Sequence, residues 1–227
     1  MFALALHALI CAIAIPIVPY QGVRAVVDTG GMTESRAQRP LDFETVYRGL
    51  GVDYAIGVDY LSLHDVRAGD TAGKPKHTVK LDVRSSPTFT SAFVNCTIGR
   101  RTYRMLLDTV AVAWPSQTTS KPVAALYLSS AAFEALHRAR PELPYRAGGR
   151  WIVDSHGAFV EAPSLVATTS CGGVTRYHRL VVEREDNATY ALLHQLYGIK
   201  VDGDVSLSAW PARGVDINFP GRALDIY

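Results

Sequence analysis

The sequence predicts a mainly β protein with two short helices, on three observations. Apolar residues alternate in paired runs separated by turn residues, at 91–107 and at 215–226. Two stretches have the capping residues and spacing of helices, at 131–140 and at 188–197. The chain has 227 residues, 48% of them hydrophobic and 19% charged, which is ordinary for a globular protein of one large or two small domains.

The first predicted hairpin brings an acidic side chain to the end of a strand. Gly99-Arg100 forms its turn, and Tyr103, Met105 and Leu107 then share one face of the second run. Asp108 follows directly. Because an ionised carboxyl group is costly to bury without partners, Asp108 is interpreted either as hydrogen-bonded structure or as a catalytic acid.

The remaining elements are predicted from turn and capping residues. A second hairpin reverses at Pro220-Gly221, between two alternating runs. Ser130 can cap the first helix, which Pro141 ends. Asn187 can cap the second helix, and Gly198 follows its last residue. Asn187 also begins a glycosylation sequon, and the capping role is favoured over a glycan.

The start of the chain and its cysteines predict a secreted protein. Residues 1–14 are uncharged and mostly apolar, which is typical of a secretory signal peptide, although a buried first strand at 13–18 is the alternative. Cys11 would leave with such a peptide. Cys96 and Cys171 would remain, and they could form one disulfide in an oxidising compartment or stay as two free thiols in the core.

A polar break at 69–77, rich in Gly, Lys and Pro, predicts a boundary between two units. The first unit is a reduced N-terminal lobe or segment at 15–82, and the second spans 83–227. A short repeat links them, since Val26-Val27-Asp28-Thr29 has the same pattern as Leu106-Leu107-Asp108-Thr109.

The stretch 104–116 resembles the Asp-Thr-Gly loop of the pepsin-like and retropepsin-like aspartic proteases, with Asp-Thr-Val in place of Asp-Thr-Gly at 108–110. Three later blocks are similar to that family in order and spacing: a helix at 128–136, a strand at 151–154 and terminal strands at 203–226. The best match is to the C-terminal lobe of the pepsin-like enzymes.

The resemblance implies an aspartic-protease-like β-barrel lobe at 83–227, preceded by the reduced N-terminal lobe or segment. It also implies roles for particular residues. Asp108 and Asp28 would be the catalytic pair, Thr109, Thr29 and Gly30 would support the two loops, and Tyr47 would be a candidate flap residue. Residues 43–49 fit a short helix equally well. Val110 keeps the backbone N–H that could donate to the Asp108 carboxylate, but its branched Cβ disfavours a positive φ.

Paired aspartates have a definite chemistry. Two carboxyl groups about 3 Å apart share one proton, so that one can deprotonate water while the other donates to the scissile carbonyl. The resemblance thus implies a secreted endopeptidase that cleaves polypeptide, as a monomer or a homodimer. The alternative is an inactive homologue that binds a peptide or protein partner.

No other function class is favoured by the composition. A net charge of +2 gives no electrostatic case for nucleic acid binding. The seven histidines lack the spacing of a metal site, and no metal or organic cofactor is expected. Asp202-Gly203-Asp204 is interpreted as a turn that enters a strand.

Overall fold

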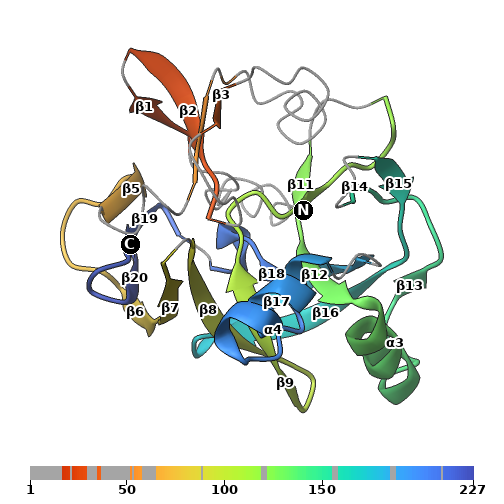
Figure 1. Ribbon diagram of the computed structural model, residues 1–227. Helices are drawn as coiled ribbons and strands as arrows, with labels where there is room; N and C mark the ends of the chain where they lie inside the picture. Colours follow the sequence, from red (N-terminus) through yellow and green to blue (C-terminus); the bar gives the residue numbers. More distant parts are fainter. Residues whose placement is uncertain are drawn as a thin grey trace, which may run out of the picture.

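Strands predominate in the computed structural model of this chain, which confirms the predicted fold class (Figure 1). The structure describes residues 17–20, 22–29, 35–36, 52, 54–57, 65–87, 89–118, 122–154, 158–184, 188–210 and 212–227. Within these residues there are two α-helices, α3 (Ser130–Ala139) and α4 (Ala188–Tyr197). The predicted signal peptide at 1–14 lies outside the described residues.

A closed barrel of six strands forms the centre of the fold. In order around the barrel the strands are β8 (Phe89–Ile98), β9 (Arg101–Leu107), β18 (Gly203–Val205), β12 (Leu126–Ser129), β17 (Val174–Arg184) and β16 (Ser164–Cys171). The barrel closes because β16 pairs with both β17 and β8. At its margins β7 (Asp82–Ser86) pairs with β8, and β13 (Tyr145–Arg146) pairs with β16.

The disulfide lies at the point where the barrel closes. Cys96 of β8 and Cys171 of β16 are directly paired residues, and their sulfur atoms are bonded. The predicted disulfide is therefore confirmed, and the alternative of two free thiols was wrong. The indole N–H of Trp210 donates to the Cys171 carbonyl at 3.0 Å, so a fully buried tryptophan packs beside this closure.

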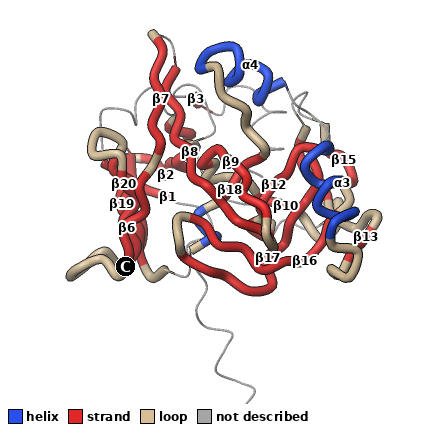
Figure 2. Tube along the Cα trace, turned by 90° about the horizontal axis from the view of Figure 1, so that it is seen from below, coloured by secondary structure: helices blue, strands red, loops and turns tan. Residues whose placement is uncertain are grey.

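Two four-stranded sheets lie beside the barrel (Figure 2). One has the order β1 (Ile17–Tyr20), β2 (Val23–Val27), β4 (Tyr54–Ile56) and β3 (Ser35–Arg36). The other has the order β5 (Asp65–Gly69), β19 (Gly214–Asn218), β20 (Ala223–Ile226) and β6 (His77–Lys80). The predicted C-terminal hairpin is thus present as β19 and β20, and it pairs with strands that precede the barrel.

Short strand pairs and one helical turn complete the described chain. They are β10 (Val112–Ala113) with β11 (Val123–Ala124), β14 (Trp151–Val153) with β15 (Phe159–Glu161), and the 3₁₀ turn η1 (Leu207–Ala209). Neither of the described helices has the length and apolar composition needed to cross a membrane.

The helix ends differ in how well the sequence predicted them. α3 begins at Ser130, and Ser129 occupies the N-cap position without a side-chain capping bond, so the prediction that Ser130 caps this helix was wrong by one residue. Leu128 and Ser129 belong to a strand that runs directly into the helix, which fixes its start by strand pairing rather than by a cap. At the end of α4, Gly198 has φ +66° and its N–H donates to the His194 carbonyl, as predicted.

Candidate functional site

Asp28 and Asp108 occupy equivalent places in two similar strand arrangements. β2 pairs in parallel with β4, which sets Val27 opposite Ile56, and β9 pairs in parallel with β18. Each aspartate directly follows the last residue of its strand, β2 or β9. The Asp-Thr repeat in the sequence therefore corresponds to a repeated pairing of strands, one in the N-terminal sheet and one in the barrel.

Reciprocal hydrogen bonds between two threonines hold the aspartate loops together. Thr29 Oγ1 donates to the Leu107 carbonyl at 2.5 Å and accepts from the Thr109 N–H at 3.1 Å. Thr109 Oγ1 donates to the Val27 carbonyl and accepts from the Thr29 N–H at 3.1 Å. Both threonines are almost fully buried. Each hydroxyl thus satisfies two backbone groups of the opposite loop, which places the two loops side by side.

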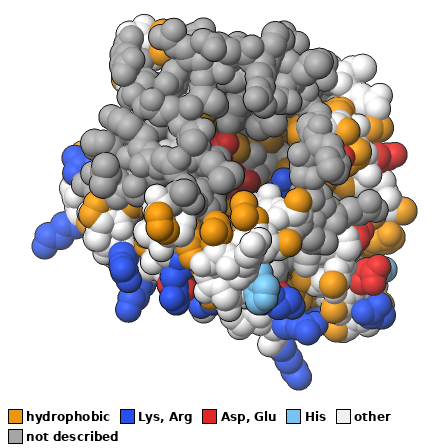
Figure 3. All heavy atoms as spheres, viewed as in Figure 1, with side chains coloured by type: hydrophobic (Ala, Val, Ile, Leu, Met, Phe, Trp, Pro, Cys, Tyr) orange, Lys and Arg blue, Asp and Glu red, His pale blue; other side chains and the backbone are white. Residues whose placement is uncertain are grey.

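Both aspartates line one cavity of about 160 Å³. Its ionisable lining consists of Asp28, Asp108, Asp154, Asp204 and Arg184. Apolar and aromatic side chains form the rest of the wall, chiefly Leu106, Val110, Val112, Trp114, Tyr127 and Val153. In Figure 3, acidic and basic side-chain atoms are visible within a hollow near the centre of the face. Four carboxyl groups and one guanidinium group, contributed by the barrel, the N-terminal sheet and the β14 strand pair, thus line one cavity.

The pKa of Asp108 is raised well above its ordinary value. Burial is the largest cause, followed by the negative charges of Asp28 and Asp204. The Arg184 guanidinium and a hydrogen bond from the Val110 N–H to Asp108 Oδ1, at 2.9 Å, act in the opposite direction. Asp108 therefore holds its proton to higher pH than an exposed aspartate, beside a second carboxyl group.

Val110 fits the loop without backbone strain. His178 and Arg222 are the non-glycine residues with a positive φ in the described part of the chain, so Val110 has an ordinary backbone conformation. The hydrogen bond predicted from its N–H to the Asp108 carboxylate is present. The conformational cost expected from a branched Cβ is not incurred, and the Val110 side chain becomes part of the cavity wall.

A buried ion pair next to Asp108 was missed by the sequence reasoning. Asp204 Oδ2 accepts from Arg184 Nη1 at 2.7 Å and from the Tyr190 hydroxyl at 3.0 Å. The Arg184 guanidinium also lies over the Tyr127 ring, 5.4 Å from its centroid. Burial lowers the pKa of Arg184, but the charge of Asp204 and its other neighbours more than offset this and raise it. The Arg184 guanidinium therefore stays charged next to Asp204, and both side chains line the cavity.

Asp204 was interpreted as part of a turn, but it lies inside strand β18. A Cβ on the neighbouring Gly203 would lie 2.0 Å from the Tyr127 carbonyl, so only glycine allows β18 to approach β12 this closely. An acidic residue between Gly203 and Val205, in a short segment flanked by Val201 and Leu207, was the signal available in the sequence.

The other predicted site residues are only partly placed. Gly30 and the candidate flap residue Tyr47 lie outside the described residues. Asp154, interpreted from the sequence as part of a surface turn, lines the cavity and accepts from the Ala158 N–H at 2.8 Å. In the described part of the chain, no three His, Cys, Asp or Glu side chains are grouped so that they could hold a metal ion.

The threonine bonds predict a selective effect of substitution. Thr109→Val should lower the free energy of unfolding by about 1–3 kcal/mol, because the Val27 carbonyl and the Thr29 N–H would both lose a buried partner. Thr109→Ser keeps the hydroxyl and should cost clearly less. Urea unfolding of both variants measures the difference, and equal losses would show that the hydroxyl does not connect the loops.

Known proteins give no independent indication of what this site does. No family model matches the chain, and neither a curated protein nor a solved structure matches it. The geometry around Asp28 and Asp108 is therefore the main basis for a functional assignment.

Proposed function

We propose that this chain is an aspartic-type endopeptidase, which hydrolyses peptide bonds with water activated between Asp28 and Asp108. The observation that supports this most directly is the reciprocal bonding of Thr29 and Thr109, which holds two strand-end aspartates at one cavity. A paired-carboxyl site needs rigid loops that bring the two groups together, and these bonds supply them.

The raised pKa of Asp108 suggests which of the two carboxyl groups acts as the acid and which as the base. Asp108 holds the shared proton and donates it to the carbonyl oxygen of the scissile bond. Asp28, as the carboxylate, takes a proton from a water molecule, and the resulting hydroxide adds to the carbonyl carbon. Asp28 then gives that proton to the departing amide nitrogen, and the C–N bond breaks. The tetrahedral hydroxyl returns its proton to Asp108 as the new carboxyl group forms.

The proposed substrate is polypeptide in an extended conformation, and the proposed location is outside the cell. Both aspartates come from one chain, so the proposed site does not require a homodimer. The disulfide that closes the barrel is compatible with an oxidising compartment, where such bonds persist.

Binding without cleavage is the second candidate function, and one observation favours it. The cavity at the aspartates is about 160 Å³, whereas ligand pockets usually measure roughly 300–1,000 Å³. A peptide therefore does not fit between the aspartates as the cavity stands, and a partner bound around its opening would be held without being hydrolysed.

Incubation of the purified protein with casein at acid and at neutral pH separates the two candidates. The endopeptidase should release new peptides at acid pH, with slower release as the pH rises through the raised pKa of Asp108. Mass spectrometry of the products identifies the cleaved bonds. Tight binding of a pepstatin-like inhibitor with no cleavage at any pH would instead support the binding protein.

A further inference from the structure

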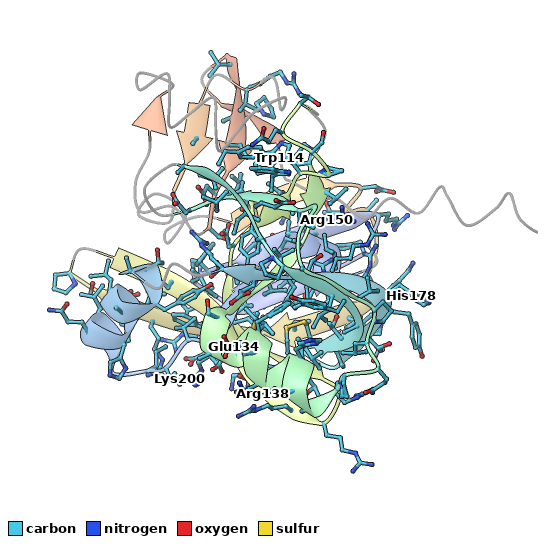
Figure 4. The ribbon with its side chains drawn as sticks, turned by 90° about the vertical axis from the view of Figure 1, so that its right-hand side faces the viewer. Trp114, Glu134, Arg138, Arg150, His178 and Lys200 are labelled. Atoms are coloured by element: carbon cyan, nitrogen blue, oxygen red, sulfur yellow. A yellow bond between two sulfur atoms is a disulfide. The ribbon has the colours of Figure 1, made fainter. Side chains whose placement is uncertain are left out.

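A second cavity, of about 530 Å³, lies at the other end of strand β9 from Asp108. It is formed where the turn between β8 and β9 meets the C-terminal end of α3. Figure 4 shows Glu134 and Arg138 of α3 far from Trp114, which lines the aspartate cavity. The two cavities therefore lie on separate parts of the barrel, and the second has a size typical of small-molecule sites.

Three arginines line this second cavity, namely Arg100, Arg101 and Arg140. The Nε of Arg140 is bonded to Glu142, which is the one carboxylate paired with these arginines in the described structure. Neither Arg100 nor Arg101 forms an ion pair with a described residue. In Figure 3 several Lys and Arg side chains gather along the lower edge of the face, where Figure 1 places the β9 turn and α3. The wall of the cavity thus has three basic side chains, of which Arg140 is paired with a carboxylate.

Tyr103 contributes to the same wall and has a buried hydroxyl group. Tyr103 is 2% exposed, no described residue accepts a hydrogen bond from its hydroxyl, and the Arg101 side chain interacts with the same hydroxyl. Burial raises the pKa of Tyr103, so the hydroxyl keeps its proton and can donate it. The Arg101 guanidinium lies over the same ring, 6.0 Å from the centroid. A buried donor without an acceptor is unfavourable, and an anion bound in the cavity would satisfy it.

The helix dipole of α3 accounts for the position of only one of the three arginines, Arg140. A positive side chain at a helix C-terminus interacts favourably with the helix dipole, and Arg140 is the C-cap residue of α3. Arg100 and Arg101 belong to the hairpin turn and its strand instead. The turn approaches Arg140 closely, since a Cβ on Gly99 would lie 2.6 Å from Arg140 Nη1. The hairpin is therefore packed so that its arginines and Arg140 border one space.

We propose that this cavity binds a small amphipathic anion, such as a medium-chain carboxylate. The carboxylate would lie among the guanidinium groups and accept from the Tyr103 hydroxyl. The apolar body of the ligand would pack against Ile98, Leu136 and Ala139, which form the rest of the cavity. This site is separate from the proposed peptidase site and does not depend on it.

Calorimetric titration with octanoate tests the proposal on the intact protein. Octanoate should bind saturably, while octanol and octylamine, which lack the negative charge, should bind at least about tenfold more weakly. Arg101→Gln and Tyr103→Phe should each weaken octanoate binding by about tenfold or more. Arg84→Gln, which removes the same charge from an exposed position on β7, is the matched control and should leave the affinity unchanged.

Three outcomes would overturn the proposal. The first is the absence of saturable octanoate binding to the folded wild-type protein. The second is equal affinity for octanol, which would indicate a purely apolar cavity. The third is equal binding by Arg101→Gln, Tyr103→Phe and Arg84→Gln, with circular dichroism confirming that all three are folded.

Discussion

Replacing Asp108 with asparagine should abolish peptide cleavage, with a loss of at least about 100-fold and up to about 10⁴-fold. Asparagine keeps the size of the side chain and can still accept from the Val110 N–H, but it cannot carry the proton that the scissile carbonyl requires. Asp28→Asn should cause a comparable loss, because the carboxylate that deprotonates water would be gone. The release of casein peptides at acid pH measures both effects.

Asp154→Asn is the matched control for these variants. It also removes one carboxylate from the cavity lining, but Asp154 follows strand β14 and accepts from the Ala158 N–H rather than belonging to the threonine-linked loops. Its cleavage rate should stay within a few-fold of the wild type. If Asp154→Asn were as inactive as Asp108→Asn, cleavage would depend on the charge of the cavity and not on a specific pair of aspartates.

The same Asp108 substitution should stabilise the protein at neutral pH. The pKa of Asp108 is higher in the folded state than in the unfolded chain, so the folded protein binds this proton more tightly. The free energy of unfolding therefore falls as the pH rises from the unfolded pKa to the folded one. Asp108→Asn should remove this fall, giving a higher melting temperature than wild type at neutral pH and little difference at strongly acid pH. A lower melting temperature at neutral pH would contradict the burial of an ionisable pair.

The strand ends around Asp108 could be predicted because the information is local. Alternating apolar residues define β9, the Asp-Thr pair follows its last residue, and the same pattern occurs before Asp28. The sequence did not decide whether a disulfide forms, because Cys96 and Cys171 are 75 residues apart and strand pairing alone determines whether they meet. Closure of the barrel between β8 and β16 is what brings them together.

The surroundings of Asp108 could not be predicted because they depend on non-local pairings. The side chains around Asp108 come from three separate elements and include Arg184, Tyr190 and Asp204. The sequence around each of these residues does not indicate that they are neighbours. Only the parallel pairing of β18 with β9 places Asp204 beside the end of β9. The first residue of α3 was predicted wrongly for a related reason. The pairing of Ser129 in β12 fixes where that helix begins.

Arg184→Met should destabilise the protein by about 3–5 kcal/mol, the largest stability effect expected at the site. The substitution leaves Asp204 as a buried carboxylate with its cation removed, and the Asp204 side chain is only 2% exposed. Adding Asp204→Asn to this variant should recover most of the loss, because the charge disappears while an oxygen remains to accept from the Tyr190 hydroxyl. Urea unfolding of the single and double variants measures the coupling.

A surface pair provides the control for that measurement. Arg138 and Glu134 form an ion pair on α3 with side chains that are 72% and 61% exposed, so Arg138→Met should cost only about 0–1 kcal/mol. If Arg184→Met cost no more than Arg138→Met, the Arg184–Asp204 pair would be well solvated rather than buried.

The two charges of the pair should also move the pH dependence of cleavage in opposite directions. Asp204 raises the pKa of Asp108 and Arg184 lowers it. Asp204→Asn should therefore shift the alkaline limb of the pH–rate profile to lower pH, and Arg184→Met should shift it to higher pH. A merely structural pair would reduce the amount of active enzyme without moving the limb, so unchanged profiles in both variants would remove Arg184 and Asp204 from the control of Asp108.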